Sequence, residues 1–184
     1  MLAIHLHSVK VLEHIHDQII MKSPQPAQLK QKLLQSHQNQ GGITATHLAC
    51  MIGNLDVLRV LKFKYDADFH FQTAQGVTPL HCAAVSPTGI VSIYFLEDIS
   101  QRFQVNVRDL HGATPLHYAI MNIEENNIQA LLSLGADINL QDNYGDSVLH
   151  VAVARFVNDQ ENFGVYKEVI KEMLQYGARR DLVN

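Results

Sequence analysis

Short apolar runs built around a small residue recur along the chain, and each is followed by a longer stretch of apolar positions at helical spacing. The short runs are Leu48-Ala49-Cys50, Cys82-Ala83-Ala84, Tyr118-Ala119-Ile120 and Val151-Ala152-Val153. The longer stretches are clearest from Ile128 to Leu134 and from Val169 to Leu174. Small residues let two helices approach closely, so this pattern predicts a series of packed helix pairs.

A four-residue box opens the first helix of each predicted pair. It is Thr-Pro-Leu-His at 78–81 and at 114–117, with looser copies at 44–47 and 147–150. Counted from residues 44, 78, 114 and 147, the steps are 34, 36 and 33 residues. Proline suits a first helical turn, and the Thr or Ser before it can cap free amides. A repeat of this period predicts a stack of similar units that bury their apolar faces against one another.

Glycines mark the ends of the units. Gly135 and Gly177 follow second helices, where glycine is the usual left-handed terminator because it has no Cβ. Three others stand two residues before a box and predict a turn there. These are Gly76, Gly112 and Gly145.

Three units depart from this pattern. The first lacks the terminal glycine and has Asp66 in the corresponding segment. The second has Pro87 directly after its first helix, and its second helix is predicted to run longer, from Thr88 to Arg102. The fourth carries a polar insertion between Arg155 and Val165, which we expect to lengthen the connection between its helices.

Residues 1–38 carry no box. Their apolar positions recur at helical spacing until Pro24 and Pro26, and a second short helix is predicted over 27–36. We therefore expect an N-terminal helical cap that covers the first unit. The last residues, Asp181 to Asn184, look like the beginning of a further unit. Two hypotheses follow: the sequence is a fragment of a longer array, or its last helices end exposed.

Together the box, the small residues, the terminal glycine and the period resemble ankyrin repeats, over about Asn39 to Asn184. The resemblance implies an all-α solenoid of four repeats, each with a β-hairpin finger and two antiparallel helices. The repeats span about 39–72, 73–108, 109–141 and 142–184. In that family the box histidine bonds within its own repeat and to the neighbouring repeat, which implies structural roles for His47, His81, His117 and His150.

Composition narrows the function. The hydrophobic content is 47% and the charged content 17%, as in globular proteins. A net charge of −4 gives no basic footprint for nucleic acid or for an anionic membrane. The chain shows no signal peptide and no run of about 20 apolar residues that would insert into a membrane. Two cysteines do not make a disulfide framework, so we expect an intracellular, cytoplasmic protein.

No residue cluster predicts catalysis, a metal or another cofactor. Cys50 and Cys82 lie near box histidines, but at core positions, where cysteines are usually inert. His7 and His14 would share a helix face, as would His5 and His16, but the two members of each pair are two turns or more apart. A structural zinc site also needs four ligands. Neither Glu124-Glu125 nor the pair Asp137 and Asp142 has an evident base or pocket. There is no glycine-rich phosphate loop, so we expect no enzyme. The N-terminal histidines are His5, His7, His14 and His16.

The resemblance implies a partner-binding surface, because ankyrin proteins commonly use the concave face of finger tips and first helices. By register, we predict that this face is apolar at its N-terminal end and more polar towards its C-terminal end. Its predicted residues are Ile43, Met51, Ile52, Phe71, Gln75, Val77, Val85, Arg108, Leu110, His111, Met121, Asn122, Asn143, Tyr144, Asp146 and Arg155.

Two aromatic residues of this set give a direct test. Replacing Phe71 or Tyr144 by alanine is predicted to weaken partner binding without lowering thermal stability. The alternative is that Phe69 and Phe71, which flank His70, pack on the N-terminal cap or on the next finger. The context of Asn139 also resembles ankyrin asparagines that become hydroxylated in animal cells; the alternative is a finger asparagine that bonds its own backbone.

The sequence therefore predicts non-catalytic protein–protein recognition by a monomer that serves as an adaptor, scaffold or targeting module. Two alternatives remain open. One is an effector that an intracellular bacterium delivers into the host cytoplasm. The other is the recognition part of a larger enzyme or channel.

Overall fold

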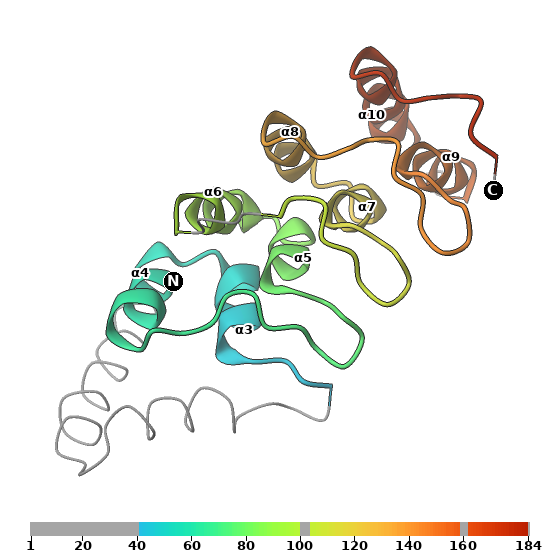
Figure 1. Cartoon of the computed structure of the whole chain (residues 1–184). Helices are drawn as coiled ribbons and strands as arrows, with labels where there is room; N and C mark the ends of the chain where they lie inside the picture. Colours follow the sequence, from blue (N-terminus) through green and yellow to red (C-terminus); the bar gives the residue numbers. More distant parts are fainter. Residues whose placement is uncertain (1–40, 100–103, 159–161, 184) are drawn as a thin grey trace, which may run out of the picture.

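The helices form two parallel rows. The structure is a computed structural model that describes residues 41–99, 104–158 and 162–183. Figure 1 shows α3, α5, α7 and α9 in one row and α4, α6, α8 and α10 in the other, so that each pair stacks on the next. The predicted helical solenoid is confirmed. The elements are α3 (Ala45–Ile52), α4 (Leu55–Arg59), the π-helical turn η2 (Val60–Lys64), α5 (Pro79–Ala84), α6 (Gly89–Ile99), α7 (Pro115–Met121), α8 (Glu125–Ser133), α9 (Val148–Asn158) and α10 (Phe163–Gln175).

The box histidine caps the start of each first helix. In repeat two the Thr78 N–H donates to His81 Nδ1 at 3.2 Å, and the Thr78 hydroxyl lies 2.9 Å from the same nitrogen. An N–H can only donate, so Nδ1 carries no proton and the ring is the neutral Nε2–H tautomer. The same bond recurs at the other three boxes, including those of repeats one and four, which lack proline. A histidine therefore takes the place that glutamate or glutamine holds in an ordinary capping box.

The same imidazoles join neighbouring repeats. His47 Nε2 lies 3.0 Å from the Val77 carbonyl, and His81 Nε2 lies 3.2 Å from that of Ala113. His117 Nε2 lies 3.2 Å from the carbonyl of Asp146. Each ring donates its Nε2–H to the finger of the next repeat, which confirms the structural role of these three histidines. An alanine stands two residues after each box histidine. These alanines are buried in the contacts between neighbouring first helices.

The fingers are turns rather than strands. Among the described residues the single β-type pairing is an antiparallel bridge between Gln141 and Ser147, so the expected β-hairpins are not formed as ladders. Side chains satisfy the finger backbone instead. Asp109 Oδ1 accepts from the N–H groups of His111 and Ala113, each at 2.9 Å. This Asx-type bonding competes with a backbone ladder and explains the difference.

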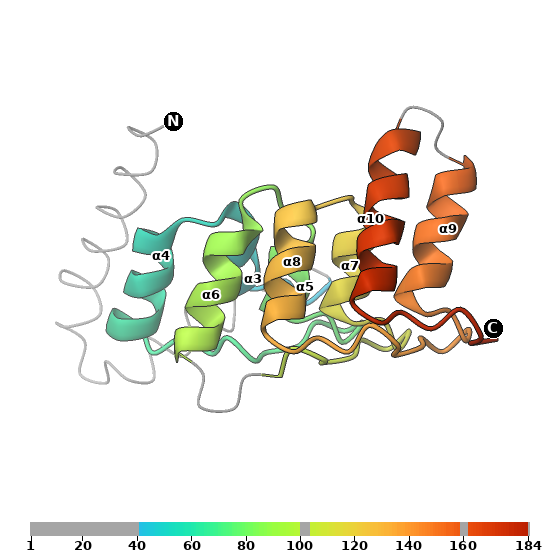
Figure 2. The same ribbon diagram turned by 90° about the horizontal axis from the view of Figure 1, so that it is seen from above.

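The insertion in repeat four lengthens its helices. We expected a longer connection, but α9 runs to Asn158 and α10 begins at Phe163. Figure 2 shows both helices projecting beyond those of the other repeats. The residues directly before the polar segment are compatible with a helix, so α9 continues through them to Asn158.

Other departures are accommodated locally. In repeat one Tyr65 N–H bonds back to the Val60 carbonyl, one residue further than in an α-helix, and Asp66 then takes the positive φ of 52° that glycine holds elsewhere. The second helix of repeat two is α6, and residues 100–102 of its predicted range lie outside the described residues. The N-terminal cap over 1–38 and its four histidines lie outside them too.

Candidate interaction surface

The finger tips are held side by side by backbone bonds. Leu110 N–H donates to the Gln75 carbonyl at 2.9 Å, and Asn143 N–H donates to that of His111 at 2.8 Å. The Asn143 side chain adds a bond from Nδ2 to the Leu110 carbonyl at 2.8 Å. These bonds fix the relative positions of three successive tips, so the finger loops lie in one row along an edge of the stack (Figure 1).

Large apolar side chains are exposed on this row and on the first helices beside it. Leu110 is 67% exposed and Tyr144 71% exposed, both at finger tips. Met51 and Ile52 at the end of α3, and Met121 at the end of α7, are exposed as well. All five belong to the set predicted from the sequence. Aromatic and Met side chains of this kind are enriched in the cores of protein interfaces.

Several predicted members are half-buried and contribute to the stack as well. The Phe71 ring meets the edge of the buried His47 ring, with centroids 6.4 Å apart. Phe69 is buried, and its ring lies 5.7 Å from that of Phe95 in repeat two. Phe69 therefore packs on α6, the second helix of repeat two, whereas the alternative weighed above named the N-terminal cap or the next finger. The other half-buried members are Ile43, Val77, Val85 and Asp146.

The polar members other than Asp146 are exposed, but some also carry structural bonds. Arg108 Nη2 donates to the Gln141 carbonyl at 2.6 Å, which links two fingers. Asn122 Nδ2 donates to the Tyr118 carbonyl at 2.9 Å at the end of α7. Gln75, His111 and Arg155 have exposed side chains. The row therefore offers apolar contacts set among polar groups that are already held in place.

A buried acid and a tyrosine support this surface, and sequence reasoning missed both. Tyr118 donates its hydroxyl proton to Asp109 Oδ2 at 2.8 Å, and its ring lies 4.9 Å from that of His81. Burial and this hydrogen bond raise the pKa of Tyr118, so the phenol stays protonated. The signal was present: Asp109 occupies the finger position before the tip, and Tyr118 directly follows the box histidine.

The cysteines are not poised for nucleophilic chemistry. Burial raises the pKa of the Cys50 thiol far above its usual range and that of Cys82 to about 11. Both thiols therefore stay protonated near neutral pH, where the thiolate would be the reactive form. Within the three described ranges no group of His, Cys, Asp or Glu side chains is arranged to hold a metal ion.

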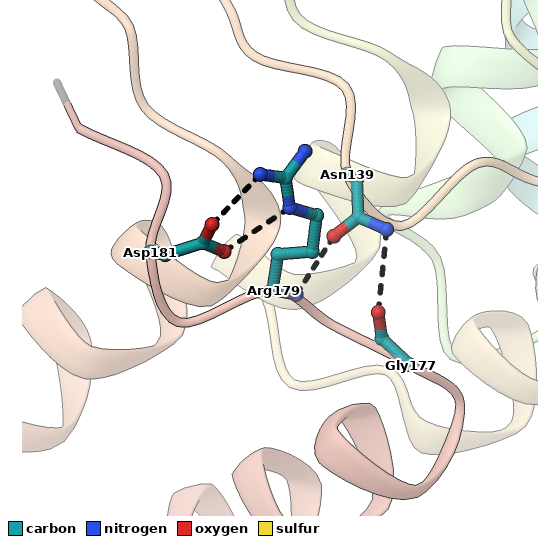
Figure 3. A network of polar contacts seen from close by, with 4 residues as sticks. All are labelled: Asn139, Gly177, Arg179 and Asp181. Carbon is teal, nitrogen blue, oxygen red and sulfur yellow. Dashed lines mark hydrogen bonds and ion pairs between the residues drawn. The ribbon is translucent and has the colours of Figure 1, made fainter.

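Asn139 joins repeat three to repeat four. Its Nδ2 donates to the Gly177 carbonyl at 3.3 Å, and its Oδ1 accepts from the Arg179 N–H at 2.8 Å (Figure 3). The alternative in which this side chain bonds its own backbone is therefore wrong. Asn106 makes the equivalent bonds one repeat earlier, to the Gly135 carbonyl and the Asp137 N–H. Hydroxylation of Asn139 stays a prediction.

The comparison with known families decides what the stack is. A family model described as ankyrin repeats (3 copies) matches residues 19–94 and 93–182. The chain belongs to the ankyrin repeat family. The stacked helix pairs, the geometry of the box and the inter-repeat bonds agree with this family, so the resemblance noted in the sequence is confirmed.

The curated proteins to which this chain is similar differ widely in kind. The chain is 33% identical over 156 residues to the probable 26S proteasome regulatory subunit p28 of Saccharomyces cerevisiae, and spans 62% of it. It is 32% identical over 152 residues to human transient receptor potential cation channel subfamily A member 1, and spans 13% of that protein. It is 30% identical over 151 residues to human neurogenic locus notch homolog protein 1, spanning 5%. Each match covers 82% of this chain.

These relatives share the ankyrin array rather than one activity. The chain spans less than two thirds of each of them, so their activities do not transfer to it directly. Ankyrin repeats generally mediate protein–protein interaction. No helix among the described residues combines the length and the apolar character needed to cross a lipid bilayer.

Proposed function

We propose that this ankyrin domain is a non-catalytic recognition module that binds a partner protein across its finger tips and first helices. The observation that carries the proposal is the fixed row of exposed apolar side chains, above all Leu110 and Tyr144. Exposing such side chains in water is unfavourable, and a partner surface would cover them. Because backbone bonds already hold the tips in register, binding needs little further ordering of the protein.

The surface favours a partner with an apolar centre and a polar rim. Leu110 and Tyr144 would fill pockets on the partner, and Gln75, Asn143 and Arg155 would form hydrogen bonds around them. The half-buried Phe71 contributes less contact area and supports His47. An adaptor, scaffold or targeting role fits this arrangement, and the cytoplasmic location stays a prediction.

A second candidate is that the domain is the recognition part of a larger protein. What favours it is the small share of the channel and the notch homolog that the chain spans, 13% and 5%. The binding surface would be the same in both cases. A bacterial effector role remains a prediction from the sequence.

The test is a comparison of two faces of one protein. Tagged wild type, Leu110→Ser, Tyr144→Ala and a control, Phe63→Ser, are used to capture proteins from a lysate of the source cells. The control lies on the convex face, which we define as the outer side of the row of second helices, away from the finger tips. Phe63 is 73% exposed on η2, so its replacement removes as much apolar surface without touching the row of tips. We expect a protein that wild type and Phe63→Ser retain and that both tip variants lose. Equal retention by all four proteins would refute the proposal.

A further inference from the structure

The fingers of repeats two, three and four are closed by the same local bonds. In each finger one side-chain oxygen of the residue that opens the turn accepts from two backbone N–H groups of the tip. That residue is Thr73 in repeat two, Asp109 in repeat three and Asp142 in repeat four. The two bonds are 3.3 and 3.1 Å long at Thr73, 2.9 and 2.9 Å at Asp109, and 2.8 and 3.0 Å at Asp142. The turn itself therefore does not distinguish the three fingers.

A further bond ties the repeat-three finger to its own first helix. The second carboxylate oxygen of Asp109, Oδ2, accepts from the Tyr118 hydroxyl on α7 at 2.8 Å, and we call this bond the finger lock. Asp109 is 7% exposed, so this charge-assisted bond forms away from bulk water. Cys82 holds the register of Tyr118 in repeat two, and Val151 holds it in repeat four. A thiol is a weak donor and valine has no donor, so of these three described fingers only the one in repeat three has the lock.

The backbone of the locked finger is engaged on both sides. The Leu110 N–H donates to the Gln75 carbonyl at 2.9 Å, and the His111 carbonyl accepts from the Asn143 N–H at 2.8 Å. The Leu110 carbonyl accepts from Asn143 Nδ2 at 2.8 Å. These peptide groups are used within the array, so a partner that approaches this tip meets the side chain of Leu110 rather than its backbone.

Rigidity of this kind affects binding energy. A side chain on a mobile loop loses conformational freedom when a partner covers it, and this loss weakens binding. On an ordered turn most of that freedom is already lost before the partner arrives. Leu110 directly follows Asp109, so the lock holds the backbone that carries this exposed side chain. Tyr144 stands two residues after Asp142, in a finger without the lock.

We propose that Tyr118 is a positioning residue, which acts through Asp109 to hold the repeat-three finger rigid and makes Leu110 the pre-ordered anchor of the recognition surface. The anchor role of Leu110 rests on the proposed function, whereas the rigidity of the finger does not. The lock is also transferable to repeat four. Asp142 and Val151 hold the registers of Asp109 and Tyr118, each 33 residues further along the chain.

Amide hydrogen exchange measures the rigidity of the fingers without any partner. In Tyr118→Phe the N–H groups of His111 and Ala113, which donate to Asp109, should exchange about tenfold faster than in wild type, because the carboxylate loses a hydrogen bond. The N–H groups of Tyr144 and Asp146 in the repeat-four finger should exchange as before. An exchange profile that Tyr118→Phe does not change, or accelerates equally in all three fingers, would overturn the proposal.

The converse experiment moves the lock to another finger. Val151→Tyr should provide a donor for Asp142 and slow the exchange of the Tyr144 and Asp146 N–H groups about tenfold. Val151→Phe is the matched control, because it adds the ring without the hydroxyl. Equal exchange rates in the two variants would show that the hydroxyl bond does not hold the finger.

A double-mutant cycle tests the anchor role of Leu110. The probe is the protein that wild type captures, and its dissociation constant is measured for Tyr118→Phe, Leu110→Ala and the double variant. Tyr118→Phe should weaken binding about tenfold alone, but less than about twofold when Leu110 is already replaced. Additive losses would refute the anchor role. If wild type captures no protein, the proposed function and the anchor role fail together, whereas the exchange rates still decide the lock.

Discussion

Repeats two and four begin with boxes of the same internal geometry, but their histidines sit in different surroundings. The imidazoles of His81 and His150 both accept from the backbone N–H of the residue that opens the box. His81 is fully buried and donates to the carbonyl of Ala113 in the next repeat. His150 is half-buried, and its Nε2 has no acceptor among the described residues. The local motif is written in the sequence, whereas the second bond depends on a neighbour.

The comparison shows where the stability of the array resides. A box capped only within its own repeat holds one helix turn, while a box bonded to the next finger also fixes the angle between two repeats. Nearest-neighbour coupling of this kind is what makes a repeat array unfold cooperatively. The interior histidines should therefore matter more than the last one.

The largest difference in stability is expected between alanine variants of these two histidines. His81→Ala leaves the Thr78 N–H and the Ala113 carbonyl without partners and opens a cavity, so it should lower the free energy of unfolding by about 4 kcal/mol. His150→Ala should cost less than about 1 kcal/mol. Guanidinium unfolding followed by circular dichroism measures both. Equal losses would show that the inter-repeat bond contributes nothing.

Acid should weaken the interior boxes next. Burial lowers the pKa of His81 to about 4 and lowers the pKa values of His47 and His117 as well. Below pH 6.5 the histidines of the unfolded chain bind protons that those of the folded chain do not. The free energy of unfolding therefore decreases as the pH is lowered from 6.5 to about 4. His81 alone should account for about 3 kcal/mol over that window.

The measurement is unfolding free energy at several pH values, with the interval from 6.5 to 5 lying above the range where most carboxylates titrate. His81→Gln serves as the control, because it removes the titrating ring and should make the slope shallower. A wild-type protein whose stability is flat across this interval would contradict the assignment of neutral, buried imidazoles.

A smaller difference is expected between two positions of the same register at the finger base. Asn139 bonds the backbone of repeat four at two points, so Asn139→Ala should lower the free energy of unfolding by about 1 kcal/mol. Asp181 holds the same register in repeat four and pairs only with the exposed Arg179. Its replacement by alanine should leave the thermal midpoint unchanged. A larger loss at Asp181 would reverse the comparison.

The sequence predicts the repeating part of this fold well because its signals are local. The box, the small residues and Gly135 and Gly177 fix helix starts, close approaches and helix ends within a few residues. The insertion of repeat four was interpreted wrongly because polarity indicated a loop, although its flanks extend both helices. The inter-repeat role of Asn139 was missed because its partners Gly177 and Arg179 lie about 40 residues away.

Within the candidate surface, register predicted which residues lie at tips and helix ends, but not how deeply each is buried. Leu110 and Tyr144 are exposed as expected, whereas the ring of Phe71 packs against that of His47, a contact between two distant positions of the same repeat that register alone does not predict. Phe71→Ala should therefore lower stability as well as binding, and Tyr144 is the cleaner probe of recognition.

The central claim is that a partner covers the row of finger tips. The most direct measurement is the dissociation constant of the captured partner by calorimetry for wild type, Tyr144→Ala and the convex control Phe63→Ser. The account predicts at least a tenfold weaker dissociation constant for Tyr144→Ala, with an unchanged thermal midpoint and wild-type binding by Phe63→Ser. Undiminished binding by Tyr144→Ala, or loss of binding by Phe63→Ser, would contradict it.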